Sequence, residues 1–153
     1  MPTKSLIIDG TYGTGQTAGV SSAGEVLVVG IGTLKTQSAF NSLNVINAAF
    51  NFFGPIAGQQ FIITSIVITG SGAMTPTIQI YEASSSSTAV IDKLLLKLVT
   101  VSSVQTPLTF VYSLPFGGFL QVSEGEYLNA QTDTATVNIN IIGYYQPIFR
   151  TIE

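Results

Sequence analysis

Runs of hydrophobic residues separated by turn residues repeat along most of the chain, starting at about residue 43. The longest of them, residues 61–69 (FIITSIVIT), consists almost entirely of β-branched and aromatic residues and lies between Gly58 and Gly70. Residues of these types favour β-strands, and glycine favours the turns that bound them. The pattern therefore predicts a series of short strands joined by loops.

Two later runs alternate between hydrophobic and polar positions, which is the period of a half-buried strand. Residues 77–81 read TIQIY, and in residues 137–145 the hydrophobic Val137, Ile139 and Ile141 alternate with asparagines. Because successive side chains of a strand point to opposite faces, this alternation predicts a sheet with one dry face and one wet face.

Two segments fit more than one kind of element. Residues 43–53 carry hydrophobic residues at both strand and helix periods, and we favour a strand because the asparagines in this segment are poor helix formers. Residues 87–99 place several apolar residues on one helical face. Here we expect a short helical turn around Val90 to Lys93, followed by a strand from Leu94.

Counted in this way, eight strands follow the first part of the chain, namely residues 43–53, 61–69, 77–81, 94–101, 108–112, 119–122, 127–131 and 137–145. Eight antiparallel strands at this spacing predict an all-β fold, an antiparallel two-sheet sandwich of the jelly-roll type. We assign this domain to residues 38–153. Residues 1–37 are rich in glycine and hold only two short apolar runs, so we expect them to form an extended N-terminal arm.

The composition shows that this predicted sandwich has unusually few charged residues. Of the 153 residues, 46% are hydrophobic and only 8% are charged, and His, Cys and Trp are absent. A typical soluble domain carries about a quarter charged residues. With so little charge to keep a lone monomer in solution, we expect much of the apolar surface to be covered by other chains.

The charge pattern and the lengths of the apolar runs bear on partners. The five basic residues are scattered along a chain of net charge -3, so they form no stripe that could follow a phosphate backbone. No run approaches the ~20 apolar residues of a membrane-spanning helix, and the start, MPTKSLIIDG, lacks the apolar core of a secretory signal. We expect no nucleic-acid partner, no membrane partner and synthesis in the cytoplasm.

Candidate chemistry is sparse. Without His or Cys, a Ser or Thr nucleophile has only Lys as an activating base, and thiolate metal sites are excluded. Glu124 and Glu126, with Asp133 nearby, form a carboxylate cluster that could act in glycoside hydrolysis or contact a cation. The same residues lie between two predicted strands, where a polar turn is expected anyway. We expect no enzyme activity, no metal and no cofactor.

The loops and the tail leave alternatives open. Residues 84–87, 116–119 and 124–133 could form the ligand-binding edge of a receptor- or sugar-binding module, with Phe116 among the contacts, although aromatic residues in a sandwich more often belong to the core. After residue 145 the tail still carries Ile148, Phe149 and Ile152. Such a tail either folds back onto its own domain or packs on a neighbouring subunit.

A Ser/Thr/Asn-rich jelly roll behind a glycine-rich arm resembles the head decoration, or cement, proteins of tailed bacteriophages. Two stretches carry the resemblance: DGTYGTGQTAGVSSAGEVLVV, which ends at Val29, and GEYLNAQTDTATVNINIIGYY, which ends at Tyr145. The resemblance implies a structural virion protein that sits as a homotrimer on the outside of the capsid and stabilises it. Its partners would be the major capsid protein and other copies of itself.

The resemblance also suggests which residues make contacts. Apolar residues of the arm would contact the capsid, namely Leu6, Ile7, Ile8, Tyr12, Leu27 and Val29. The tail residues Ile148, Phe149 and Ile152 would contact neighbouring subunits. The alternative hypothesis is a receptor- or carbohydrate-binding jelly-roll module of a phage fibre.

Overall fold

The chain divides into two compact units, Met1–Lys35 and Thr36–Glu153. The computed structural model describes residues 17–20, 26–29, 35–113, 120–134 and 136–148. In the first unit, the described residues form an antiparallel hairpin of β1 (Thr17–Val20) and β2 (Val26–Val29). The strand β2 coincides with the second apolar run of the predicted arm.

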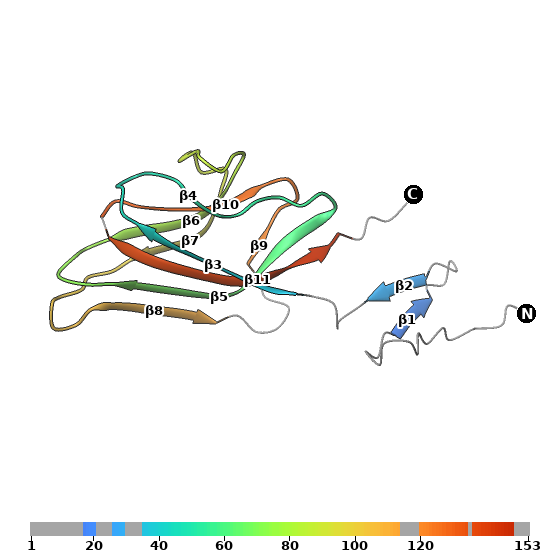
Figure 1. The fold of residues 1–153 in the computed structure, drawn as a ribbon, viewed down its shortest axis with the longest axis horizontal. Helices are drawn as coiled ribbons and strands as arrows, with labels where there is room; N and C mark the ends of the chain where they lie inside the picture. Colours follow the sequence, from blue (N-terminus) through green and yellow to red (C-terminus); the bar gives the residue numbers. More distant parts are fainter. Residues whose placement is uncertain (1–16, 21–25, 30–34, 114–119, 135, 149–153) are drawn as a thin grey trace, which may run out of the picture. The chain divides into compact units, whose positions relative to one another are not determined.

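The described part of the second unit contains strands and loops but no helix. Its strands are β3 (Thr36–Leu43), β4 (Phe50–Phe53), β5 (Gln59–Gly70), β6 (Thr77–Ala83), β7 (Lys93–Val99), β8 (Leu108–Ser113), β9 (Gln121–Val122), β10 (Tyr127–Thr132) and β11 (Val137–Pro147). They form two antiparallel sheets (Figure 1). One sheet has the order β3-β11-β5-β8, with β9 paired to β5, and we call it the β11 sheet. The other has the order β4-β10-β6-β7, and we call it the β10 sheet.

This strand order is that of a jelly roll, because the chain passes repeatedly from one sheet to the other and places strands distant in sequence side by side. The predicted two-sheet sandwich is therefore confirmed. The hydrophobic core lies between the sheets, and its largest contributions come from the two longest strands, β5 and β11. The alternation predicted in residues 137–141 is confirmed, since Val137, Ile139 and Ile141 are fully buried and the asparagines between them face outward.

The single strand predicted over residues 43–53 is wrong in its extent. β3 ends at Leu43 and β4 begins at Phe50, because the segment between them turns from one sheet to the other. At this turn Asn47 has a φ of 55°, a left-handed conformation that asparagine tolerates better than most residues. Its N–H donates a hydrogen bond to the carbonyl of Thr132 at 2.8 Å.

The sequence pattern does not predict the strand β3. It begins at Thr36, so Thr36 and Gln37 belong to the sandwich rather than to the arm. Two of its inward positions are the polar Gln37 and Asn41, and the pattern TQSAFNSL therefore lacks the apolar alternation that marks a strand. In the described part of the predicted run 119–122, β9 contains Gln121 and Val122, and Leu120 precedes the strand.

The helical turn expected around Val90 to Lys93 is also wrong. Residues 84–92 form a loop, and β7 starts directly at Lys93. The N–H of Asp92 donates to the carbonyl of Glu82 at 3.0 Å, so strand pairing with β6 extends into this segment. Cross-strand pairing therefore overrides the local helical periodicity.

Candidate functional site

Charged residues are absent from one of the two sheets. The strands of the β11 sheet, including β9, contain no Asp, Glu, Lys or Arg. The charged residues of the described sandwich lie in the β10 sheet (Glu82, Lys93, Lys97), in the loop between β6 and β7 (Asp92) and in the loops that connect the two sheets (Glu124, Glu126, Asp133), and Lys35 directly precedes β3. The low overall charge is thus distributed asymmetrically between the two layers.

The register of the β11 sheet determines which residues share its outer face. Val67 pairs with Asn140 on one side and with Val111 on the other, and Asn140 pairs with Phe40. These four residues therefore form one row across all four strands. The two adjacent rows are Ser42, Asn138, Thr69 and Thr109 on one side, and Ser38, Ile142, Ser65 and Ser113 on the other. We call the three rows the uncharged outer face.

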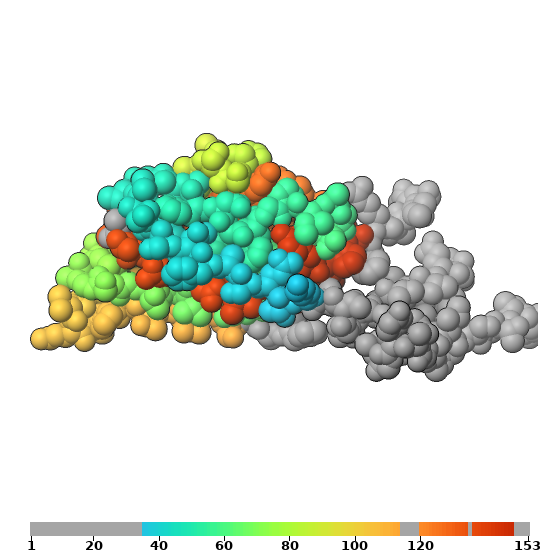
Figure 2. Space-filling model, viewed as in Figure 1, coloured from blue at the N-terminus to red at the C-terminus, as the bar shows by residue number. Residues whose placement is uncertain are grey.

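Large apolar side chains lie in water at both edges of this face. Phe40 on β3 is 65% exposed and Val111 on β8 is 62% exposed, and atoms of both strands are visible at the surface in Figure 2, β3 in cyan and β8 in yellow-orange. Beside Phe40 on the same strand, the hydroxyl of Ser38 donates to Oδ1 of Asn140 at 2.8 Å. The face thus offers an apolar row flanked by neutral hydrogen-bonding groups.

Of the edge strands of the two sheets, one carries charge. β7, at one edge of the β10 sheet, carries Lys93 and Lys97, and lysine on an edge strand discourages pairing with other chains. β4, at the other edge of that sheet, and β3 and β8, the edges of the β11 sheet, carry neither charge nor proline. Both edges of the β11 sheet therefore lack the charged residues that usually discourage pairing with neighbours.

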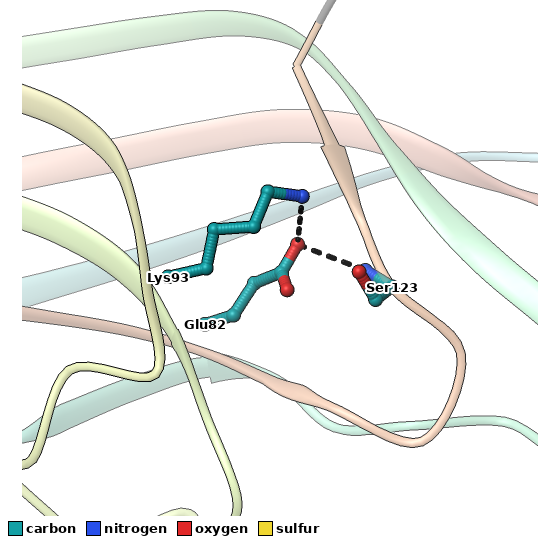
Figure 3. Close-up of polar contacts among 3 residues, drawn as sticks. All are labelled: Glu82, Lys93 and Ser123. Carbon is teal, nitrogen blue, oxygen red and sulfur yellow. Dashed lines mark hydrogen bonds and ion pairs between the residues drawn. The ribbon is translucent and has the colours of Figure 1, made fainter.

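Glu82 is the main buried charge of the described residues, and it ties the two sheets together (Figure 3). Its Oε1 accepts hydrogen bonds from Nζ of Lys93 at 3.1 Å and from the backbone N–H of Ser123 at 3.0 Å. Glu82 and Lys93 belong to the β10 sheet, whereas Ser123 directly follows β9 of the other sheet. The carboxylate of Glu82 therefore accepts hydrogen bonds from both layers of the sandwich.

The predicted carboxylate cluster is not gathered in space. Glu124 and Glu126 precede β10 and Asp133 follows it, so a strand of six residues, about 20 Å long, separates them. Oε1 of Glu124 accepts from the N–H of Gly58 at 3.2 Å, and one oxygen of Glu126, Oε2, is buried without a hydrogen-bond partner. The part of the chain that the structure describes holds no group of three or more His, Cys, Asp or Glu residues that could bind a metal ion.

Asp133 serves a structural purpose at the far end of β10. Its Oδ1 accepts from the N–H of Thr77 at 2.7 Å and from the hydroxyl of Thr134 at 3.1 Å. The Thr77 hydrogen bond is the largest cause that lowers the pKa of Asp133 below its ordinary value. The carboxylate is held ionised as a cap on the start of β6.

The serine-rich loop, residues 84–87, was expected to form part of a binding edge. Buried polar side chains of the β10 sheet donate hydrogen bonds to this loop and the residue after it. The amide of Asn129, which is fully buried, donates to the carbonyls of Ser85 at 2.9 Å and Thr88 at 3.3 Å. The Tyr81 hydroxyl also donates to the Thr88 carbonyl, at 3.0 Å, and burial raises the pKa of Tyr81. The loop, yellow-green in Figure 1, therefore lies on the outer side of the β10 sheet. Phe116 and Phe119, from the same candidate edge, are outside the described residues.

Most of the predicted contact residues also fall outside the described residues, namely Leu6, Ile7, Ile8, Tyr12, Phe149 and Ile152. Leu27 and Val29 lie in β2. The half-buried Ile148 directly follows β11, and its N–H donates to the carbonyl of Gly58 at 2.9 Å. The first residue of the tail thus continues along its own domain beside the start of β5.

Sequence reasoning did not identify the uncharged outer face. The asparagines of residues 137–145 indicated a wet face on that strand, but only the strand order shows that three further charge-free strands join it. No protein-family model matches the chain, and no curated protein matches its sequence. None of the described residues belongs to a helix long and apolar enough to cross a membrane.

Proposed function

We propose that this chain is a structural protein that decorates and stabilises the outside of a tailed-bacteriophage capsid as a homotrimer, in contact with the major capsid protein. The observation that supports the proposal best is the charge-free β11 sheet. A whole layer of the domain displays neutral side chains, and the carboxylates of Glu82, Glu124 and Asp133 accept structural hydrogen bonds. Such a surface suits attachment to other protein chains better than it suits catalysis.

A decoration protein stabilises a shell through buried surface rather than through a reaction. A glycine-rich segment such as residues 1–35 would add contact area on the capsid to that of the sandwich. Because many copies bind a symmetric shell, a modest free energy per copy multiplies over the particle. Contacts made by uncharged residues also depend little on ionic strength.

The test is binding to empty capsids that are assembled from the major capsid protein of the same phage and lack a decoration layer. The full chain should sediment with the shells, and a chain that begins at Thr36, the start of the second compact unit, should remain folded and stay in the supernatant. The full-length double variant Ile7→Ser/Ile8→Ser should lose occupancy, whereas Thr14→Ser in the same segment should not.

Two outcomes would contradict the proposal at different points. If the full chain does not bind the shells at all, the decoration function is wrong. If the chain that begins at Thr36 binds with normal occupancy, the decoration function stands but the capsid contact belongs to the sandwich rather than to the arm.

A further inference from the structure

We infer that the uncharged outer face is the surface through which copies of this chain associate with one another. The inference rests on the proposed function, since it locates the subunit contact of the proposed homotrimer. The occupant of the face is a second copy of the chain, and the central row of Phe40, Asn140, Val67 and Val111 forms the middle of the contact.

The distribution of charge supports association between identical copies. Each chain carries a net charge of -3, so contacts through randomly chosen surfaces would bring like charges together. The strands of the β11 sheet are free of charge, and two copies that meet there keep Glu82, Lys93 and Lys97 of the β10 sheet away from the contact. No charge has to be desolvated when this face is buried.

The size of the face fits the centre of a contact. Strands lie about 4.8 Å apart and rise about 3.3 Å per residue, and the three rows run over five residues of each of the four strands, such as residues 65–69 of β5. These values give a face of about 19 Å by about 17 Å, or about 320 Å². A specific protein–protein contact buries about 800 Å² on each partner, so the three rows would form the middle of a larger contact that extends along the same charge-free strands.

The chemistry of the face resembles that of an interface rather than that of a solvated sheet. Its middle row holds the exposed Phe40 and Val111, and the rows beside it hold mainly Ser, Thr and Asn. An apolar centre with a neutral polar border is the usual anatomy of a protein contact. Sheet faces of this kind pack against each other at about 10 Å, with their side chains interdigitated.

The symmetry of the assembly determines what the face meets. In a two-fold dimer the face would pack on the same face of the other copy, whereas in a three-fold ring it must pack on a different surface of the next copy. The exposed Val99, Val101 and Val104, at the end of β7 and in the loop before β8, offer a second apolar surface for the ring. The proposed homotrimer requires this second arrangement.

The experiment measures the mass of the full-length chain by light scattering over a range of concentrations. The wild type should show a multiple of 16.1 kDa, and Phe40→Lys or Val111→Lys should weaken association at least about tenfold, because a charge is buried in the contact. Val90→Lys is the matched control, since Val90 is 66% exposed but lies in the loop on the β10 sheet. It should leave the mass unchanged.

A second measurement does not depend on how well a lysine variant folds. The chain contains no cysteine, so single variants Val111→Cys and Val90→Cys can be labelled with a thiol reagent at one site. Labelling of Val111→Cys should slow as the protein concentration rises and the face becomes covered. Labelling of Val90→Cys should stay fast at every concentration.

The outcomes separate this inference from the proposed function. A wild-type monomer, or Phe40→Lys and Val111→Lys variants with undiminished mass, would overturn the inference even if the protein binds capsids. An assembly that dissociates on these substitutions but does not bind capsids would support the inference and contradict the decoration function. A dissociable dimer would support the face as the contact and contradict the homotrimer.

Discussion

At the scale of single residues, Gly143 shows how one position determines the geometry of the β11 sheet. The pairing of β11 with β5 shifts between Ile142 and Gly143, and the hydroxyl of Thr64 donates to the carbonyl of Ile142 at 3.1 Å. A Cβ atom on residue 143 would contact the carbonyl oxygen of Ile62 and would lie 2.7 Å from the ring of Phe61. Only glycine allows the strands and the core ring to approach so closely at this bulge.

We therefore expect Gly143→Ala to lower the free energy of unfolding by about 2–3 kcal/mol, at the upper end of the usual cost of overpacking because a backbone atom is involved. Gly54→Ala is the control, since its Cβ would lie 3.5 Å from the ring of Tyr127, an ordinary contact. This substitution should change stability by less than about 1 kcal/mol. Urea denaturation of both variants measures the difference, and equal midpoints would contradict the close approach at residue 143.

At the scale of elements, Asn129 of β10 connects three segments of the chain. Its amide donates to the serine-rich loop, and its Oδ1 accepts from Nδ2 of Asn51 in β4 at 3.0 Å. Asn51 in turn accepts at its backbone carbonyl from the side chain of Asn41 in β3 at 2.8 Å. A series of asparagines thus links the loop, the β10 sheet and the edge of the β11 sheet.

Removal of this side chain should affect stability and the loop together. Asn129→Ala leaves buried polar groups without partners, and we expect it to cost about 1–3 kcal/mol of unfolding free energy. Gln131→Ala is the control on the same strand, because Gln131 is half-buried and its amide donates to Oε1 of Gln79 at 3.0 Å, and it should cost less than about 1 kcal/mol. Urea denaturation gives the stability, and limited proteolysis reports whether residues 84–88 open. Similar behaviour of the two variants would show that the loop is held by other contacts.

An element could be predicted where its own residues carry the apolar pattern, and not where pairing with a distant strand determines it. β5 and β11 were predicted because their inward positions are apolar without exception along their middle parts. β3 could not be predicted, because it is held in place by its register with β11 rather than by its own inward residues, Gln37, Ala39, Asn41 and Leu43. The expected helical turn is wrong although residues 87–99 carry a helical period of apolar residues. Pairing with β6 makes this segment a loop and the strand β7 instead.

At the scale of the whole molecule, composition predicted that surface would be covered but could not say which surface. The fraction of charged residues, 8%, can be read from the sequence. The absence of charge from one sheet cannot, because that sheet is assembled from strands that lie far apart in sequence. β3 and β11, for example, are neighbours in the sheet and are separated by most of the domain in sequence. A candidate contact face of this kind emerges only after the strand order is known.

An uncharged contact predicts how the dissociation constant of the assembly depends on salt. Raising NaCl from about 0.1 M to about 1 M shortens the screening length from about 10 Å to about 3 Å, so contacts between charges should weaken strongly and contacts between neutral residues should not. We expect the dissociation constant of the wild type, from light scattering, to change less than about threefold over this range, and ammonium sulfate to tighten association because it strengthens apolar burial. The matched control is Val111→Lys, which should stay weakly associated at both NaCl concentrations, because salt does not remove the cost of desolvating a buried ammonium group. A wild-type assembly that dissociates in 1 M NaCl would show that charged residues outside the β11 sheet hold the copies together.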